Sequence, residues 1–216
     1  MQTHLSLFLL CRSPAALASA QATEELRTRG AKAWEQVLRL HGARQLAEES
    51  AGGAAEADPA KTSEFALREE LALRPEDPVP RVALARRLHR DGRLDEAADA
   101  YRRAIECGAE GWHVRARLGA ALLASGDADA AGTVLADAAV KAPAEAAVQR
   151  LLAWSLLVRG RDDDAIAACD AALALVPADA LAKKARALAR IHRGETDEGL
   201  RDLAAAGGLE QPGPRE

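Results

Sequence analysis

Residues 91–97 read Asp-Gly-Arg-Leu-Asp-Glu-Ala, and this stretch returns three times along the chain. The corresponding stretches are SGDADAA at 125–131, RGRDDDA at 159–165 and RGETDEG at 193–199, so successive copies are 34 residues apart. Glycine and aspartate keep their columns in all four copies, and alanine closes the first three. A fixed interval of this length is typical of a repeat protein in which each unit packs on its neighbours.

Each repeat is predicted to be a pair of helices. Apolar residues between 79 and 90 recur with helical spacing. Gly92 then supplies the positive φ with which many helices end. Asp95 and Glu96 fall in the first turn of the next helix, where acidic side chains can cap free N–H groups and face the positive end of the helix dipole.

The composition supports helices and excludes several functional classes. The chain has 216 residues, of which 53 are alanine and 30 leucine, against only 12 valines and isoleucines and six aromatic residues. That balance excludes a large β-structure. With 29 basic and 33 acidic residues, the net charge of −4 is not that of a polyanion-binding protein. Three cysteines without a CxxC pair exclude a disulfide-rich domain and a zinc ribbon.

These features resemble the tetratricopeptide repeat family, which has a 34-residue period, a glycine in the first half, alanines in the second helix and a proline near the end. With each glycine at position 15, the repeats are 78–111, 112–145, 146–179 and 180–209. The resemblance implies an all-α, right-handed superhelical solenoid of stacked helix-turn-helix repeats. The predicted helices lie near 80–90, 94–107, 112–124, 128–141, 146–159, 163–175, 180–192 and 196–206.

The columns of the repeat also predict a core. We expect ten side chains to be buried: Leu84, Leu88, Tyr101, Leu118, Leu122, Leu135, Leu152, Leu156, Cys169 and Leu173. One column departs from the family, because position 4, usually large and apolar, carries Arg81, Arg115, Gln149 and Lys183. The residues one place earlier are expected to take over that packing role: Pro80, Val114, Val148 and Ala182.

The fourth repeat and the flanks are less regular. Arg186 and Arg190 occupy core positions 7 and 11 of the fourth repeat, which is either a terminal cap with a polar outer face or a decayed repeat that frays; we favour the cap. Residues 23–77 are predicted to be a degenerate helical region with a flexible connection, in which 63–74 resembles the second helix of an earlier repeat. Residues 210–216 are predicted to be a disordered tail.

The first 22 residues form a leader with two interpretations. An apolar run at 5–11 and the Ala-Ser-Ala at 18–20 suggest a signal peptide that is cleaved on export, but no lysine or arginine precedes the run and Arg12 interrupts it. The alternative is an N-terminal helix that packs on the repeats. We therefore expect a cytoplasmic protein, or an exported one if residues 1–20 are removed. The chain has no apolar run of 18 residues that would span a membrane.

A search for chemistry finds no catalytic or metal-binding pattern. HExxH, GxSxG and a phosphate-binding glycine loop are all absent from the sequence. The three aspartates at 162–164 are interpreted as a charged helix start and not as a metal site. We predict no catalytic residue, no metal and no cofactor. Basic residues exceed acidic ones by one in the first repeat and by two in the fourth, while the second and third repeats are acidic, so nucleic acid is disfavoured as a ligand.

Protein recognition is the function that the resemblance implies. In the family, ligand contacts come mostly from positions 2, 5, 6, 9, 12 and 13 of the first helices, and these positions hold no acidic residue here. We predict a concave groove that binds a peptide or protein segment, as in an adaptor. Trp154 is either an anchor for that ligand or a packing residue. The predicted groove residues are Arg86, His89, Arg90, His113, Arg117, Arg150, Trp154, Leu157, Lys184, Leu188 and Ile191.

An alternative function is a structural assembly subunit that contacts other chains through its N-terminal region or its convex face. Apolar exposure distinguishes the two, since an adaptor exposes it in the groove and an assembly subunit exposes it elsewhere. The partner, the pathway and the oligomeric state are not encoded in any pattern that we can identify.

Overall fold

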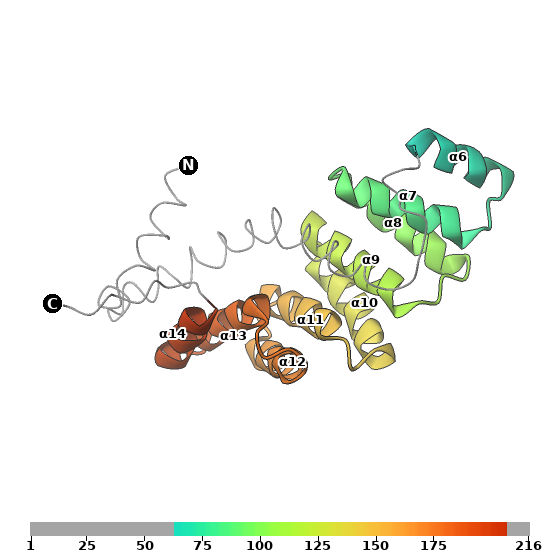
Figure 1. The fold of residues 1–216 in the computed structure, drawn as a ribbon. Coiled ribbons are helices and arrows are strands. Elements are labelled where there is room, and N and C mark those ends of the chain that lie inside the picture. Colours follow the sequence, from blue (N-terminus) through green and yellow to red (C-terminus); the bar gives the residue numbers. More distant parts are fainter. Residues whose placement is uncertain (1–62, 207–216) are drawn as a thin grey trace, which may run out of the picture. The chain divides into compact units, whose positions relative to one another are not determined.

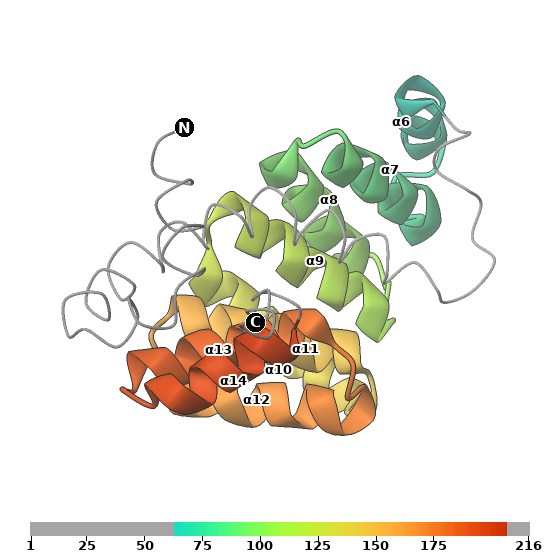
Figure 2. The same ribbon diagram turned by 60° about the vertical axis from the view of Figure 1, so that its left-hand side comes forward.

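The repeats fold as antiparallel helix pairs, as Figures 1 and 2 show. The computed structural model describes residues 63–206, which fall into two compact units, 63–143 and 144–206. The first unit holds α6 (Glu64–Leu73), α7 (Pro78–Arg90), α8 (Leu94–Glu106), α9 (Trp112–Ser125) and α10 (Ala128–Lys141). The second unit holds α11 (Ala146–Val158), α12 (Asp162–Leu175), α13 (Ala180–His192) and α14 (Thr196–Ala205).

The predicted helices are confirmed, each to within two residues at either end. Residues 63–206 contain no strand, and none of their helices is long and apolar enough to cross a bilayer. The helix expected within 63–74 is also present, as α6. The predictions for the leader, for residues 23–62 and for the tail lie outside the described residues.

Glycines end the first helices as expected. Gly92, Gly126, Gly160 and Gly194 all have positive φ, between 70 and 97°. In each case the backbone N–H of the following residue donates to the carbonyl five residues before it at 2.9 Å, which closes the helix end. Gly108 makes the same turn after α8, in the repeat whose second helix is not followed by a proline.

The predicted capping by acidic residues is wrong for α8, and α12 begins in the same way. Their N-cap residues are Arg93 and Arg161, and neither helix has a side-chain cap. The acidic residues of the first turn instead pair with those arginines, Glu96 with Arg93 and Asp164 with Arg161. An arginine that precedes two or three acids draws their carboxylates away from the backbone N–H groups.

The core follows the small and apolar columns of the repeat. Eight of the ten predicted core side chains are buried, and so are Pro80, Val114, Val148 and Ala182 beside them. Leu152 and Leu173 are only half-buried. Leu173 belongs to a column whose other members, such as Ile105, are half-exposed as well.

Two glycines bring helices into close contact. A Cβ atom on Gly119 of α9 would lie 2.4 Å from Cγ of Leu135 on α10. One on Gly199 of α14 would lie 2.7 Å from Cγ1 of Ile191 on α13. Real Cβ atoms do not approach that closely, so these positions require glycine for packing and not for backbone freedom.

Ion pairs fill the core positions of the last repeat. Arg186 binds Asp202 through two hydrogen bonds, of 2.6 and 2.8 Å, and Arg190 binds the same carboxylate at 2.7 Å. Arg186 also donates to Asp170 of α12 at 2.6 Å. Polar residues thus occupy positions that are apolar in the other repeats, and they pair with one another between α12, α13 and α14.

Candidate binding surface

The predicted groove residues lie on the first helices of the pairs, which are α7 and α9 in the first unit and α11 and α13 in the second. We call the sides that carry them the first-helix faces. Arg86, His89, Arg90, His113 and Arg117 belong to the first unit; the remaining six belong to the second. A single groove across all four repeats therefore stays a prediction, and each unit presents its own face.

In the first unit the predicted groove residues that remain accessible are basic. Arg90 is exposed, while Arg86 and His113 are half-buried. Arg90 has no ion pair with any of the residues 63–206. Arg117 and His89 are buried, with only 2 % and 6 % of their surface exposed. The face thus offers a charged rim around a buried histidine and arginine.

His89 is neutral at physiological pH. Burial lowers the pKa of its imidazole to about 4, and the positive charge of Arg117 contributes to this shift. Neither ring nitrogen has a hydrogen-bond partner among the described residues. A protonated ring would be a second positive charge in a buried position beside Arg117, so the ring stays uncharged until the solution is strongly acidic.

In the second unit the face is mainly apolar and buried. Trp154 is only 1 % exposed, and Leu157, Leu188 and Ile191 are buried as well. Trp154 is therefore a core residue in this structure, which answers the question that the sequence left open. Lys184 is half-buried. The indole N–H of Trp154 has no hydrogen-bond partner within the described part of the chain.

Arg150 is a structural residue of the second unit. It donates from Nη1 to Oδ2 of Asp179 at 2.6 Å, and the two side chains are 8 % and 5 % exposed. The other oxygen of Asp179 accepts from the backbone N–H groups of Leu181 and Ala182, at 3.0 Å each, and so caps α13. One carboxylate thereby joins α11 to the start of α13.

Sequence reasoning missed Asp179 and a second contact of this kind. Nδ1 of His192 lies 3.1 Å from Oδ1 of Asp162, which joins the end of α13 to the start of α12. An aspartate one residue before a predicted helix is a capping signal, and Asp179 could have been found that way. Its pairing with Arg150, 29 residues away, has no local signal.

The described residues contain no group of three side chains suited to a metal ion. Burial raises the pKa of the Cys169 thiol to about 12, so this cysteine stays protonated and is a packing residue. The first-helix face of the first unit presents hydrogen-bond donors and positive charge, which suits recognition of carboxylates.

A model of the tetratricopeptide repeat family matches residues 88–155, which include three glycine turns and the helices around them. This part of the chain belongs to the tetratricopeptide repeat family. The match begins in α7 and ends in α11, so it covers the second repeat in full and parts of the first and third. No curated protein matches the chain significantly.

Solved structures share its fold. A crystal structure of MamA is 20% identical with a TM-score of 0.63, over 66% of this chain and 78% of that one. MamA from Desulfovibrio magneticus RS-1 is 18% identical with a TM-score of 0.64, over 77% and 94%. YrrB, described as a TPR protein with an unusual peptide-binding site, is 17% identical with a TM-score of 0.62, over 66% and 74%. At these identities the likeness shows the fold of this chain and no more.

Proposed function

We propose that the protein is a non-catalytic adaptor that binds a peptide or protein segment on its first-helix faces, and that the segment carries carboxylates. The observation that carries this proposal is the charge of the faces. Among the 24 predicted contact positions none is acidic, although the chain as a whole has four more acidic than basic residues.

The basic residues of the first unit would bind the acidic part of the segment. Arg90 is exposed and Arg86 is half-buried on the same helix, four residues apart and therefore on one side of it. Guanidinium groups favour carboxylates because they donate two parallel hydrogen bonds. Such an exposed rim mainly speeds association and selects the partner, while packing at buried residues determines how long the complex lasts.

Peptide binding is known for one protein of the same fold, since the structure of YrrB is described by its peptide-binding site. The fold stacks helix pairs, and stacked first helices make an extended surface that suits a bound segment. The proposal for this chain extends that mode of binding to a basic face.

The test compares two arginines of matched exposure. Arg90 lies on the first-helix face of α7, whereas Arg103 is exposed on α8, and neither has an ion pair with a described residue. The partner is captured with the full chain and identified by mass spectrometry, and its binding segment is synthesised. Titration calorimetry at low salt should show that Arg90→Glu weakens binding about 3–10-fold, while Arg103→Glu binds like the wild type.

The salt dependence completes the test. The effect of Arg90→Glu should shrink at high salt, because exposed charges are screened. Equal affinities for the wild type and both variants at low salt, with all three folded, would remove the first-helix face of the first unit as the site.

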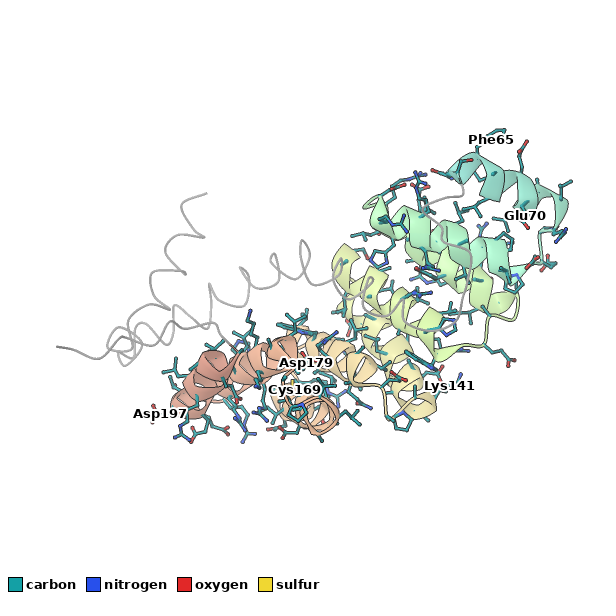
Figure 3. The ribbon with its side chains drawn as sticks, in the orientation of Figure 1. Phe65, Glu70, Lys141, Cys169, Asp179 and Asp197 are labelled. Atoms are coloured by element: carbon teal, nitrogen blue, oxygen red, sulfur yellow. The ribbon has the colours of Figure 1, made fainter. Side chains whose placement is uncertain are left out.

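A second candidate is the assembly subunit, because most exposed apolar side chains lie off the first-helix faces. Phe65 and Leu73 of α6 are 71 % and 82 % exposed, and Figure 3 shows Phe65 on the side of α6 away from α7. On the faces themselves only Val79 and Val158 are large, apolar and exposed. Two large apolar side chains exposed on one short helix indicate a contact with another chain.

Analytical ultracentrifugation of the full chain tests this candidate. If α6 holds copies together, the wild type should sediment as an oligomer and the variant Phe65→Ser/Leu73→Ser as a monomer. A wild type that is monomeric at 100 µM, a concentration of the order reached in weak assemblies, would exclude self-assembly through α6.

A further inference from the structure

A surface pocket of about 410 Å³ lies on the first unit. Its apolar lining comes from three helices: Ile105 of α8, Leu118 of α9 and Val134 of α10. Leu118 is buried, and the other two are half-buried. The pocket is large enough for one bulky side chain of a partner, and its apolar lining surrounds that side chain on three sides.

The pocket exists because an arginine stands where the family usually has a large apolar residue. Arg115 is at position 4 of the second repeat. Its Nε lies 2.7 Å from Oδ2 of Asp137 in an ion pair, and its Nη1 donates to the carbonyl of Glu110 at 2.8 Å. These two contacts hold the guanidinium at the edge of the pocket, where it forms a flat cationic wall.

The charges around the pocket are balanced except for one. Arg102 binds Asp99, and Asp137 binds both Arg115 and Lys141. Glu106 also lines the pocket and is exposed, but it pairs with none of the described residues. The edge of the pocket therefore carries one carboxylate that lacks a cation.

The equivalent space in the last repeat is closed. When the second repeat is aligned with the fourth, two repeat lengths further along the chain, Arg186 takes the position of Leu118 and Asp202 that of Val134. Asp170 takes the position of Arg102 in the same alignment. There Arg186 forms ion pairs with both aspartates. Where the terminal repeat has a closed ionic network, the second repeat has an open apolar pocket.

The pocket and the first-helix face use opposite sides of α9. Successive residues of an α-helix are rotated by about 100°. Arg115 and Leu118 therefore point roughly opposite to Ala116, Arg117 and Ala120, which belong to the first-helix face. A ligand in the pocket leaves that face free, so this site is independent of the proposed adaptor function.

We propose that this pocket is a second docking site, which takes an aromatic side chain of a partner protein that is followed by a lysine or arginine. The ring packs on Leu118 between Ile105 and Val134 and stacks on the guanidinium of Arg115, as aromatic rings do on arginine. The neighbouring cation pairs with Glu106.

Dipeptides test this on the full chain, labelled with ¹⁵N, at low salt. The probes are N-acetyl-Phe-Lys-amide, N-acetyl-Phe-Glu-amide and N-acetyl-Ala-Lys-amide. The first should shift the amide signals of Ile105, Leu118 and Val134 and bind about 2–5-fold tighter than the second, the range of an exposed ion pair. The alanine probe should produce no saturable shift, because it lacks the ring.

Two variants assign the interactions. Glu106→Gln should keep binding of both phenylalanine probes but abolish the preference for lysine. Val134→Trp fills the pocket and should abolish binding of both, with circular dichroism checking that the helices remain. The proposal is overturned if neither phenylalanine probe moves these signals, if the preference for lysine is absent in the wild type or survives Glu106→Gln, or if a folded Val134→Trp variant still binds.

Discussion

Basic residues that share one predicted role have different environments in the structure. Arg90 is exposed and has no ion pair with a described residue, whereas Arg150 lies in a buried ion pair with Asp179. His89 is buried beside Arg117 and is neutral. The same column of the repeat can thus hold a charge that meets a ligand or one that supports the fold, and substitution distinguishes them.

Protonation of His89 should destabilise the fold. Its pKa is lowered to about 4 in the folded protein and is near 6.5 in the unfolded chain. Because the folded state resists the proton, the full stability is present above pH 6.5 and is lost as the pH falls toward 4. Between pH 7 and pH 5 we expect a loss of about 2 kcal/mol in the free energy of unfolding, measured by urea titration.

The control for this prediction is His89→Gln, which removes the titrating ring. Between pH 7 and pH 5, its free energy of unfolding should fall by less than that of the wild type. The difference between the two losses is the contribution of His89, separate from that of the carboxylates, which titrate at lower pH. Parallel pH profiles for the two proteins would contradict the buried, neutral imidazole.

Arg150→Met should destabilise the second unit by about 3–5 kcal/mol, because it leaves Asp179 buried without its cation. The double variant Arg150→Met/Asp179→Asn should recover part of that loss, since asparagine can still cap α13 and carries no charge. Urea unfolding measures both variants. An unchanged midpoint for Arg150→Met would show that the arginine is not needed for the fold.

At the scale of helices, the interval between glycines determines where each element ends, and the alanine columns determine how closely pairs pack. Ala97, Ala131 and Ala165 have no exposed surface at all. The end of α8 shows how local the helix stop is, because Gly108 turns the chain there although Ala109 occupies the column that holds Pro143 and Pro177 after α10 and α12.

Gly119→Ala should destabilise the first unit although alanine is the better helix former. A Cβ there would lie 2.4 Å from Leu135, and overpacking of this kind costs about 1–3 kcal/mol, against a gain of about 1 kcal/mol in helix propensity. Thermal melting should show a lower midpoint for Gly119→Ala, and Leu135→Val in the same chain should restore part of it. A higher midpoint for the single variant would contradict the close contact between α9 and α10.

At the scale of the whole molecule, the sequence predicted all eight helices of the four repeats. The same columns of residues recur in each repeat, so each helix boundary is indicated several times. The sequence predicted less about side chains. The acids after Arg93 and Arg161 do not cap their helices, and Trp154 proved to be buried, because each depends on neighbours outside its own helix. The pocket beside Arg115 also had a signal, the missing large residue at position 4, but its shape required coordinates.

The most direct test of the adaptor function is photo-crosslinking of the captured partner to the full chain. A photoreactive amino acid replaces either His113, on the first-helix face of α9, or Arg103, exposed on α8. Each variant is irradiated with the partner segment, and the adducts are quantified by mass spectrometry. We predict adducts from position 113 and only background from position 103; adducts from position 103 with none from position 113 would contradict binding on the first-helix faces.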